Sequence, residues 1–295
     1  MKGLKDFPMK KLLLGLAAAG LGTMLAFGIA AAAEEEHNAA EPTHFPIKKP
    51  EEMNWTFAGP FGHYDKQQLQ RGLKIYKEVC SACHSMNLVA FRSLEELGYT
   101  EAQVKAFAAE YEVPGEPNAD GEIVNRKAIP ADHFPSPYAN PQAAAAANGG
   151  AVPPDFSLIA KARAVERGFP RFMFDIFTQY QEGGPDYIHA LLTGFGETPP
   201  EGMQIPEGTH YNPYFIAAKS LAMAQPLQDG QVTYDDGSPQ TLAQYSQDIA
   251  AFLMWAAEPH LEDRKKTGFR VMIFLVLFAG LIYVAKRRIW SDVEH

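Results

Sequence analysis

The chain has 295 residues, of which 46% are hydrophobic and 12% aromatic, and its formal net charge at pH 7 is −9. This composition excludes an intrinsically disordered protein and is sufficient for a buried core in one or two domains. The acidic balance argues against a nucleic-acid partner, because a phosphate backbone would be repelled.

Residues 1–33 have the pattern of a cleaved signal peptide. Four lysines precede an uncharged stretch at 12–33, and Ala31 and Ala33 fit the small-residue pattern of a cleavage site. The stretch is also long enough to span a bilayer, so a retained N-terminal anchor is the alternative. The acidic, proline-containing residues 34–60 are expected to form an extended arm.

Residues 65–79 are predicted to form a helix, because leucines and Tyr76 recur at helical spacing between polar residues. Gly72 inside this helix costs about 1 kcal/mol of helix propensity, which indicates that a second helix crosses close to it. Residues 242–257 are the candidate for that helix. We expect Phe252 to contact Gly72, although ordinary core packing would also explain an apolar residue there.

The first helix leads into Cys80-Ser81-Ala82-Cys83-His84, a C-x-x-C-H motif. This spacing is typical of covalent haem attachment, because each thiol can add to one vinyl group while the adjacent imidazole reaches the iron. A zinc site is one alternative, but it would need about four ligands and the chain has only these cysteines. A thioredoxin-like dithiol is the other, but it is expected after a β-strand, whereas the preceding residues are predicted to be helical.

The rest of the body is predicted to consist of helices and long loops, without a β-sheet. Within residues 34–263, 15 Lys and Arg stand against 32 Asp and Glu, a net charge of −17. Such a surface favours encounter with a basic protein, although solubility alone would also explain it. Helices are predicted at 101–112, 171–180 and 186–192, and loops at 113–141, 142–150, 199–211 and 228–239.

Residues 271–285 are uncharged and rich in aliphatic side chains, and with their flanks they reach the length that spans a bilayer. The basic residues 286–288 favour a cytoplasmic tail. We therefore predict a transmembrane anchor at 264–288 and a tail at 289–295. A buried core helix is the alternative.

A haem that only transfers electrons usually has two axial ligands, and a methionine opposite a histidine raises its reduction potential. Met223 is the preferred second ligand, because small residues and a proline surround it. The other candidates are Met53, Met173 and Met203, with His133, His189 and His210 as further alternatives.

Five sequence motifs occur in one order over about residues 55–290. Together they resemble the cytochrome c1 family, the haem c subunits of cytochrome bc1 complexes. They are Cys80-Ser81-Ala82-Cys83-His84, Asn148-Gly149-Gly150-Ala151-Val152-Pro153-Pro154-Asp155, Leu192-Thr193-Gly194, Asn212-Pro213-Tyr214-Phe215 before Met223, and Phe252-Leu253-Met254-Trp255-Ala256-Ala257-Glu258-Pro259. The resemblance implies a mostly α, class I cytochrome c-like haem domain with long loops at 34–263, plus one C-terminal transmembrane helix.

The resemblance also implies a set of cofactor residues. One haem c would be attached through Cys80 and Cys83, with His84 and Met223 as iron ligands. Further residues of the haem pocket, implied only by the resemblance, are Asn148, Pro154, Arg163 and Tyr187, the last two near the propionates.

The partners implied by the resemblance are cytochrome b and a Rieske iron–sulfur protein in a dimeric complex, membrane lipid, and a basic soluble cytochrome c as acceptor. The haem domain would lie on the periplasmic side of a bacterial inner membrane. The chain would then be a redox subunit and not an enzyme by itself. Alternatives are an independent anchored shuttle, a terminal oxidase subunit, or a tethered thiol oxidoreductase.

The chain departs from the family pattern in three places. It lacks the cysteine pair that some bacterial relatives use to hold the segment before the distal methionine. Gln225 stands where relatives often have a proline. Residues 164–180 resemble an insertion between Arg163 and the glycine pair that precedes Tyr187.

Overall fold

The computed structural model describes residues 47–164, 169–170, 173–175 and 182–291. By its internal contacts the chain separates into two units, Met1–Pro46 and Ile47–His295, and all the described residues belong to the second unit. The predicted signal peptide, most of the predicted helix at 171–180 and the end of the predicted tail lie outside the described residues.

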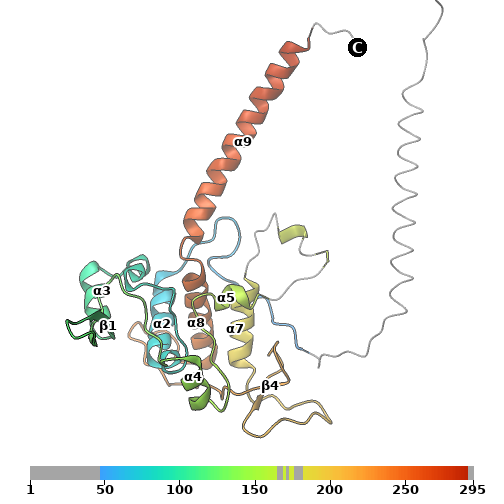
Figure 1. The fold of residues 1–295 in the computed structure, drawn as a ribbon. Helices are drawn as coiled ribbons and strands as arrows, with labels where there is room; N and C mark the ends of the chain where they lie inside the picture. The colour runs from blue at the N-terminus through green and yellow to red at the C-terminus, as the bar shows by residue number, and fades with distance from the viewer. Residues whose placement is uncertain (1–46, 165–168, 171–172, 176–181, 292–295) are drawn as a thin grey trace, which may run out of the picture. The chain divides into compact units, whose positions relative to one another are not determined.

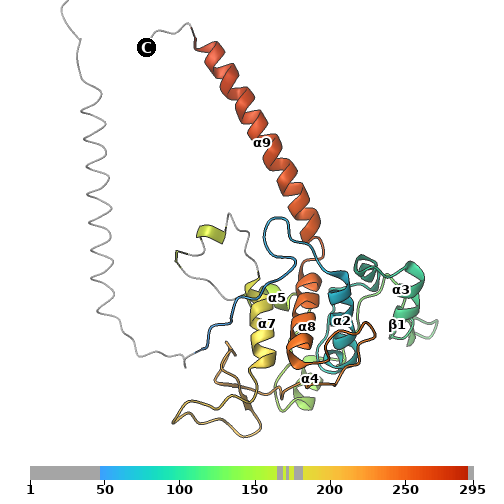
Figure 2. The same cartoon turned by 180° about the vertical axis from the view of Figure 1, so that it is seen from behind.

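Two helices form the centre of the domain, α2 (Lys66–Glu78) and α8 (Leu242–Ala257), and they run side by side in Figures 1 and 2. Asp65 caps α2 by accepting hydrogen bonds from two backbone amides of the first turn, and Thr241 caps α8 by accepting from the amide of Gln244. Such caps satisfy amides that have no partner inside the helix. Both predicted helices are confirmed.

The crossing of α2 and α8 requires a glycine at position 72. A Cβ atom built on Gly72 would overlap the Cβ atom of Phe252 and the carbonyl oxygen of Asp248. The ring of Phe252 also lies 6.1 Å from that of Tyr76. The predicted contact between Gly72 and Phe252 is therefore confirmed, and its physical reason is the close approach of two helix backbones.

A third helix, α7 (Gly183–Thr193), packs against α8 on the side away from α2, with the short α5 (Ile159–Ala162) beside it. The helix predicted at 186–192 is confirmed, and it begins earlier. The backbone of Gly184 lies so close to Ala160 that an added Cβ would overlap the Ala160 carbonyl oxygen. This approach explains how the helix start is buried against α5.

Short elements surround the three helices: η1 (Cys80–Ala82), η2 (Phe91–Leu97), α3 (Glu101–Ala108) and α4 (Pro141–Ala147). The helix predicted at 101–112 is confirmed in its first two turns. The prediction of a loop at 142–150 was wrong over most of its length. Alanines have the highest helix propensity, Asn140 caps the first turn and Pro141 fits the first helical position.

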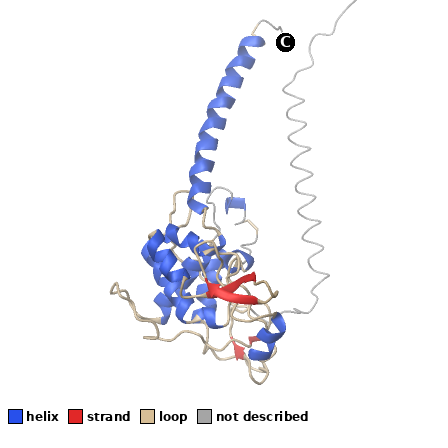
Figure 3. Cartoon of the chain, turned by 60° about the vertical axis from the view of Figure 1, so that its left-hand side comes forward, coloured by secondary structure: helices blue, strands red, loops and turns tan. Residues whose placement is uncertain are grey.

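The prediction that the chain has no β-sheet was also wrong. Strands β1 (Glu112–Pro117) and β2 (Ile123–Lys127) form an antiparallel hairpin, and β3 (His210–Tyr211) pairs with β4 (Ser220–Leu221). The strands are red in Figure 3. Every residue of β2 is exposed, and only Val113 of β1 is buried, so the hairpin has almost no buried face that would produce an alternating apolar pattern.

The last helix, α9 (Leu261–Ile289), is the one helix among the described residues that is long and apolar enough to cross a membrane. Its most apolar window is 0% buried in the protein, which contradicts the alternative of a buried core helix. It contains the predicted anchor at 264–288. Its last turn carries Lys286, Arg287 and Arg288, and these positive charges interact favourably with the negative end of the helix dipole.

Candidate haem site

The C-x-x-C-H motif folds into one tight turn at the end of α2. The backbone amides of Cys83 and His84 both donate to the carbonyl oxygen of Cys80, at 3.1 and 2.9 Å. The two thiols are free and half-buried. Burial, together with the nearby Cys83, raises the pKa of the Cys80 thiol to about 12. A thiol whose pKa is raised is a weak nucleophile at neutral pH, so Cys80 lacks the activation of a reactive cysteine.

His84 is buried, and one of its ring nitrogens has a fixed partner. Its Nδ1 atom lies 2.9 Å from the carbonyl oxygen of Pro154. A carbonyl oxygen only accepts, so Nδ1 carries the proton and Nε2 of the neutral ring has its lone pair available. Burial lowers the pKa of His84 and favours that neutral form. An imidazole held in this way is suited to bind a metal through Nε2.

Two aromatic residues fix the position of His84. The Phe156 ring stacks on the imidazole with centroids 4.0 Å apart and an interplanar angle of 17°. The Tyr76 hydroxyl donates to the backbone carbonyl of His84 at 3.1 Å. The stacked ring restricts the imidazole, and the hydroxyl holds the backbone that carries it. Sequence reasoning gave Phe156 no role, because one phenylalanine after a proline-rich segment carries no distinctive pattern.

The carboxylate of Asp155 joins the segment after the motif to the segment that carries Pro154. Its oxygens accept from Ser85 Oγ at 2.7 Å, from the amide of Asn87 at 2.9 Å and from the amide of Ser157 at 2.8 Å. Burial alone would raise the pKa of Asp155, but these hydrogen bonds outweigh it and hold the pKa below its ordinary value. Asp155 therefore fixes the loop that presents the Pro154 carbonyl to His84.

Arg163 and Tyr187 lie close enough to interact electrostatically, although the predicted insertion separates them in the sequence. Arg163 is the C-cap of α5, and Tyr187 is a buried residue of α7. Burial raises the pKa of Tyr187, while the backbone of Ile216 and the charge of Arg163 partly offset that rise. The placement of these two residues near the propionates stays a prediction.

Asn148 and Met223 lie in the two segments that complete the predicted site. Asn148 follows α4, and its Nδ2 atom donates to the Tyr138 hydroxyl at 3.0 Å and to the Ala144 carbonyl at 2.7 Å. Met223 follows β4 and is half-buried. No hydrogen bond among the described residues links either of them to His84. The role of Met223 as an iron ligand stays a prediction.

The segment before Met223 is held by hydrogen bonds where some relatives have a disulfide. The strand pair β3–β4 closes it, and the Thr209 and Ser220 hydroxyls bond at 2.8 Å. Asn212 is buried and its Nδ2 atom donates to the Leu191 carbonyl at 2.7 Å, which ties the segment to α7. The motif that contains Asn212 is therefore structural in at least this residue.

These residues fit a covalently attached haem. The two thiols lie on one turn beside an imidazole whose Nε2 atom is available, and the Phe156 ring stacks on that imidazole. The described residues contain no group of three or more His, Cys, Asp or Glu side chains that could hold a metal ion, so the zinc alternative has no support in them. The paired cysteines and the oriented imidazole suit haem attachment, and this places the protein in the class of c-type cytochromes.

Comparison with known proteins gives the particular family. Residues 55–293 match the model of the Cytochrome C1 family. The chain therefore belongs to this family, which makes it a haem protein of electron transport.

Similar proteins occur in bacteria and in mitochondria. The chain is 58% identical over 247 residues to "Cytochrome b/c1" of Bradyrhizobium diazoefficiens. The aligned region covers 83% of this chain and 36% of that longer protein. The chain is 45% identical over 274 residues to "Cytochrome c1" of Blastochloris viridis, covering 92% and 94% of the two chains. It is 43% identical over 282 residues to "Cytochrome c1 1, heme protein, mitochondrial" of Arabidopsis thaliana, covering 95% and 82%.

Proposed function

We propose that this chain is the haem c subunit of a cytochrome bc1 complex, which accepts one electron from a Rieske iron–sulfur protein and passes it to a soluble c-type cytochrome. The observation that carries the proposal is the hydrogen bond between His84 Nδ1 and the Pro154 carbonyl beside the two thiols, in a chain of the Cytochrome C1 family. The family supports the haem subunit, and the donor and acceptor are part of the proposal.

In this proposal Cys80 and Cys83 would hold the haem through thioether bonds, and His84 and Met223 would bind its iron. The bound haem supplies a one-electron couple between ferric and ferrous iron. The residues of the chain do the rest. Pro154 and the ring stacked on His84 orient the imidazole, which keeps the ligand neutral and in one tautomer.

Arg163, Tyr187 and Asn148 are proposed to line the same pocket. A guanidinium beside a partly buried propionate would neutralise its charge through a charge-assisted hydrogen bond. The electrostatic influence of Arg163 on the Tyr187 hydroxyl supports this proposal. The overall domain is proposed to be of the class I cytochrome c type.

The proposed setting is a bacterial inner membrane, with residues 34–263 on the periplasmic side and α9 as a single-pass anchor in lipid. The name of the Bradyrhizobium relative combines cytochrome b and c1, which supports cytochrome b as a neighbouring subunit. We further propose a dimeric complex in which the chain is not an enzyme by itself. The acidic body, with a net charge of −17 over 34–263, supports a basic cytochrome c as the acceptor.

The test of cofactor attachment is the mass of the mature chain together with haem staining on a denaturing gel. We expect one porphyrin mass on the chain, a stained band, and no titratable thiols. Cys80→Ser and Cys83→Ser should each remove one thioether, while Ser81→Ala in the same turn is the matched control and should stain fully. A mature chain with two titratable thiols and no porphyrin would overturn the proposal.

An independent anchored shuttle or a terminal oxidase subunit fits the same haem site and anchor. Purification from membranes in mild detergent distinguishes them, because the proposed subunit should co-purify with a b-type cytochrome and an iron–sulfur protein in constant ratio. Recovery of the chain without a b-type haem in such a preparation would favour the shuttle.

A further inference from the structure

A loop at residues 57–64 carries an exposed phenylalanine next to the start of α9. Phe57 and Tyr64 at its ends are buried, whereas Phe61 is 77% exposed. Gly59 has a φ of 68°, and the amide of Gly62 donates to its carbonyl oxygen. The loop is therefore a tight turn with buried ends, and it holds an aromatic ring away from the core.

This loop contacts three residues of α9 in turn. The amide of Tyr64 donates to Glu262 Oε1 at 3.0 Å, and Lys265 Nζ donates to the Phe57 carbonyl oxygen at 2.6 Å. The Phe61 and Phe269 rings meet edge to face with centroids 5.9 Å apart. Residues 262, 265 and 269 are three and four positions apart, so they lie on one face of the helix. The loop thus follows that face from the domain toward the apolar part of α9.

The position of Phe61 along α9 is set by this ring contact. The uncharged part of α9 begins at Val271, which lies about 3 Å beyond Phe269 at the rise of an α-helix. Phe61 is therefore level with the point at which the helix changes from charged to apolar. In a membrane-spanning helix that point lies at the boundary between headgroups and hydrocarbon.

We propose that the 57–64 loop is a second membrane contact, in which Phe61 inserts into the lipid interface and fixes the haem domain relative to its anchor. The inference rests on α9 being the membrane anchor of the proposed function. A lipid surface suits the loop better than a protein partner, because lipid can accept one exposed ring. A stable protein contact buries about 800 Å² on each side, which is far more than one phenylalanine ring provides.

The test uses nitroxide labels on the full chain in vesicles of palmitoyl-oleoyl phosphatidylcholine. Phe61→Cys reports on the loop. Ile123→Cys, on the exposed strand β2, is the reference for water, and Leu277→Cys, in the middle of α9, is the reference for hydrocarbon. Collision of each label with oxygen, which concentrates in lipid, is compared with collision with a water-soluble nickel chelate. The parent chain without an added cysteine shows whether the native thiols react.

We expect the ratio of oxygen to nickel collisions to be severalfold higher at position 61 than at 123, and lower than at 277. Equal ratios at 61 and 123 would place the loop in water and overturn the inference. Low collision with both reagents at 61 would indicate burial against protein and would overturn it as well. A water-like ratio at 277 would instead refute α9 as the membrane anchor. Labelling of the parent chain would refute haem attachment. A failure of the proposed function can therefore be told apart from a failure of this inference.

Discussion

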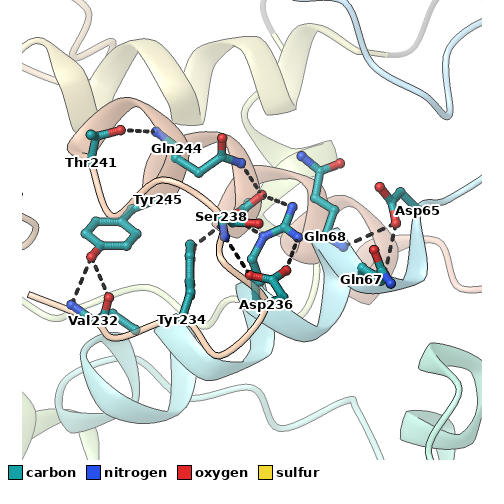
Figure 4. A network of polar contacts seen from close by, with 12 residues as sticks. Asp65, Gln67, Gln68, Val232, Tyr234, Asp236, Ser238, Thr241, Gln244 and Tyr245 are labelled. Atoms are coloured by element: carbon teal, nitrogen blue, oxygen red, sulfur yellow. Dashed lines mark hydrogen bonds and ion pairs between the residues drawn. The ribbon is translucent and has the colours of Figure 1, made fainter. Parts of the chain in front are cut away.

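Arg71 of α2 and Asp248 of α8 form a two-pronged ion pair where the two helices cross. Arg71 Nε lies 2.8 Å from Asp248 Oδ2, and Nη2 lies 3.1 Å from Oδ1. The Asp248 side chain is 0% exposed. Tyr234 and Gln244, which are labelled in Figure 4, donate to the same carboxylate at 2.8 and 2.9 Å. A buried charge is tolerated when its partner and its remaining lone pairs are satisfied in this way.

Removing the carboxylate should therefore destabilise the domain strongly. Asp248→Ala leaves the half-buried guanidinium of Arg71 with only Asp236 as an acidic partner, and we expect the free energy of unfolding to fall by about 3 kcal/mol, at the low end of the cost of breaking a buried pair. Denaturant unfolding of the detergent-solubilised protein, followed by circular dichroism, measures the change. Lys74→Ala is the control, because it removes a pair with Asp235, which is 87% exposed, and should cost at most about 1 kcal/mol. Equal losses would contradict a special role for the buried pair.

The crossing also predicts a steric effect at Gly72. In Gly72→Ala the new methyl group would overlap Phe252 and the backbone of Asp248, so the helices must separate, at a cost of about 1 to 3 kcal/mol. Gly268→Ala is the matched control, because a Cβ atom there meets nothing within 4 Å. The same unfolding measurement applies to both. A Gly72→Ala protein as stable as the parent would show that the two helices do not approach so closely.

The parts of the fold that the sequence predicted are those with a periodic apolar pattern or a steric marker. Helix α2 shows both, since leucines recur at helical spacing and Gly72 marks the crossing, whereas α8 shows only apolar residues in its second half. The hairpin β1–β2 shows neither, because it has almost no buried face and contains prolines. The alanines of α4 have no apolar stripe to distinguish them from a flexible linker, so only their helix propensity could have revealed that helix.

The candidate site shows the same division. The haem motif could be recognised because its five residues are contiguous, and Pro154 followed from the resemblance. The clamp by Asp155 could not be found, because its hydrogen bonds to Ser85 and Asn87 join positions 70 and 68 residues apart. Hydrogen bonds between distant segments leave no periodicity in a single sequence.

Asp155 should make stability depend on pH in the acid range. Its folded pKa is held below the ordinary value, so it contributes stability above the unfolded pKa. This contribution is lost as the pH falls through the folded pKa. Asp155→Asn should lower the free energy of unfolding by about 1 to 3 kcal/mol at neutral pH. The Nδ2 atom of the asparagine is itself a donor, and it would replace an oxygen that accepts a hydrogen bond. The parent should then lose more stability than the variant on acidification.

Unfolding curves of the two proteins from pH 7 down to pH 3 test this difference. Asp120→Asn, in the exposed turn between β1 and β2, is the control and should follow the parent curve. If Asp155→Asn and the parent lose stability in parallel as the pH falls, the carboxylate does not hold the loop in its ionised form.

The second iron ligand is the part of the proposed site that most needs a direct test. A neutral thioether favours ferrous iron, so Met223→Leu should leave the haem attached through both cysteines and lower its reduction potential. We expect a fall on the order of a few tenths of a volt, within the about 0.8 V range that axial ligands set. Redox titration of the purified protein gives the potential, and a haem-stained gel shows that attachment is unchanged.

Met203→Leu is the matched control for this substitution, because Met203 is also a half-buried methionine in the segment after α7. It should keep the potential of the parent, since a methionine that only packs can be replaced by leucine with little change. A normal potential in Met223→Leu together with a lowered one in Met203→Leu would transfer the ligand role to Met203. Normal potentials in both variants would point to one of the remaining methionine or histidine candidates for the second iron ligand. Among these, His189 already has a partner for its Nδ1 atom, which lies 2.9 Å from Ser246 Oγ.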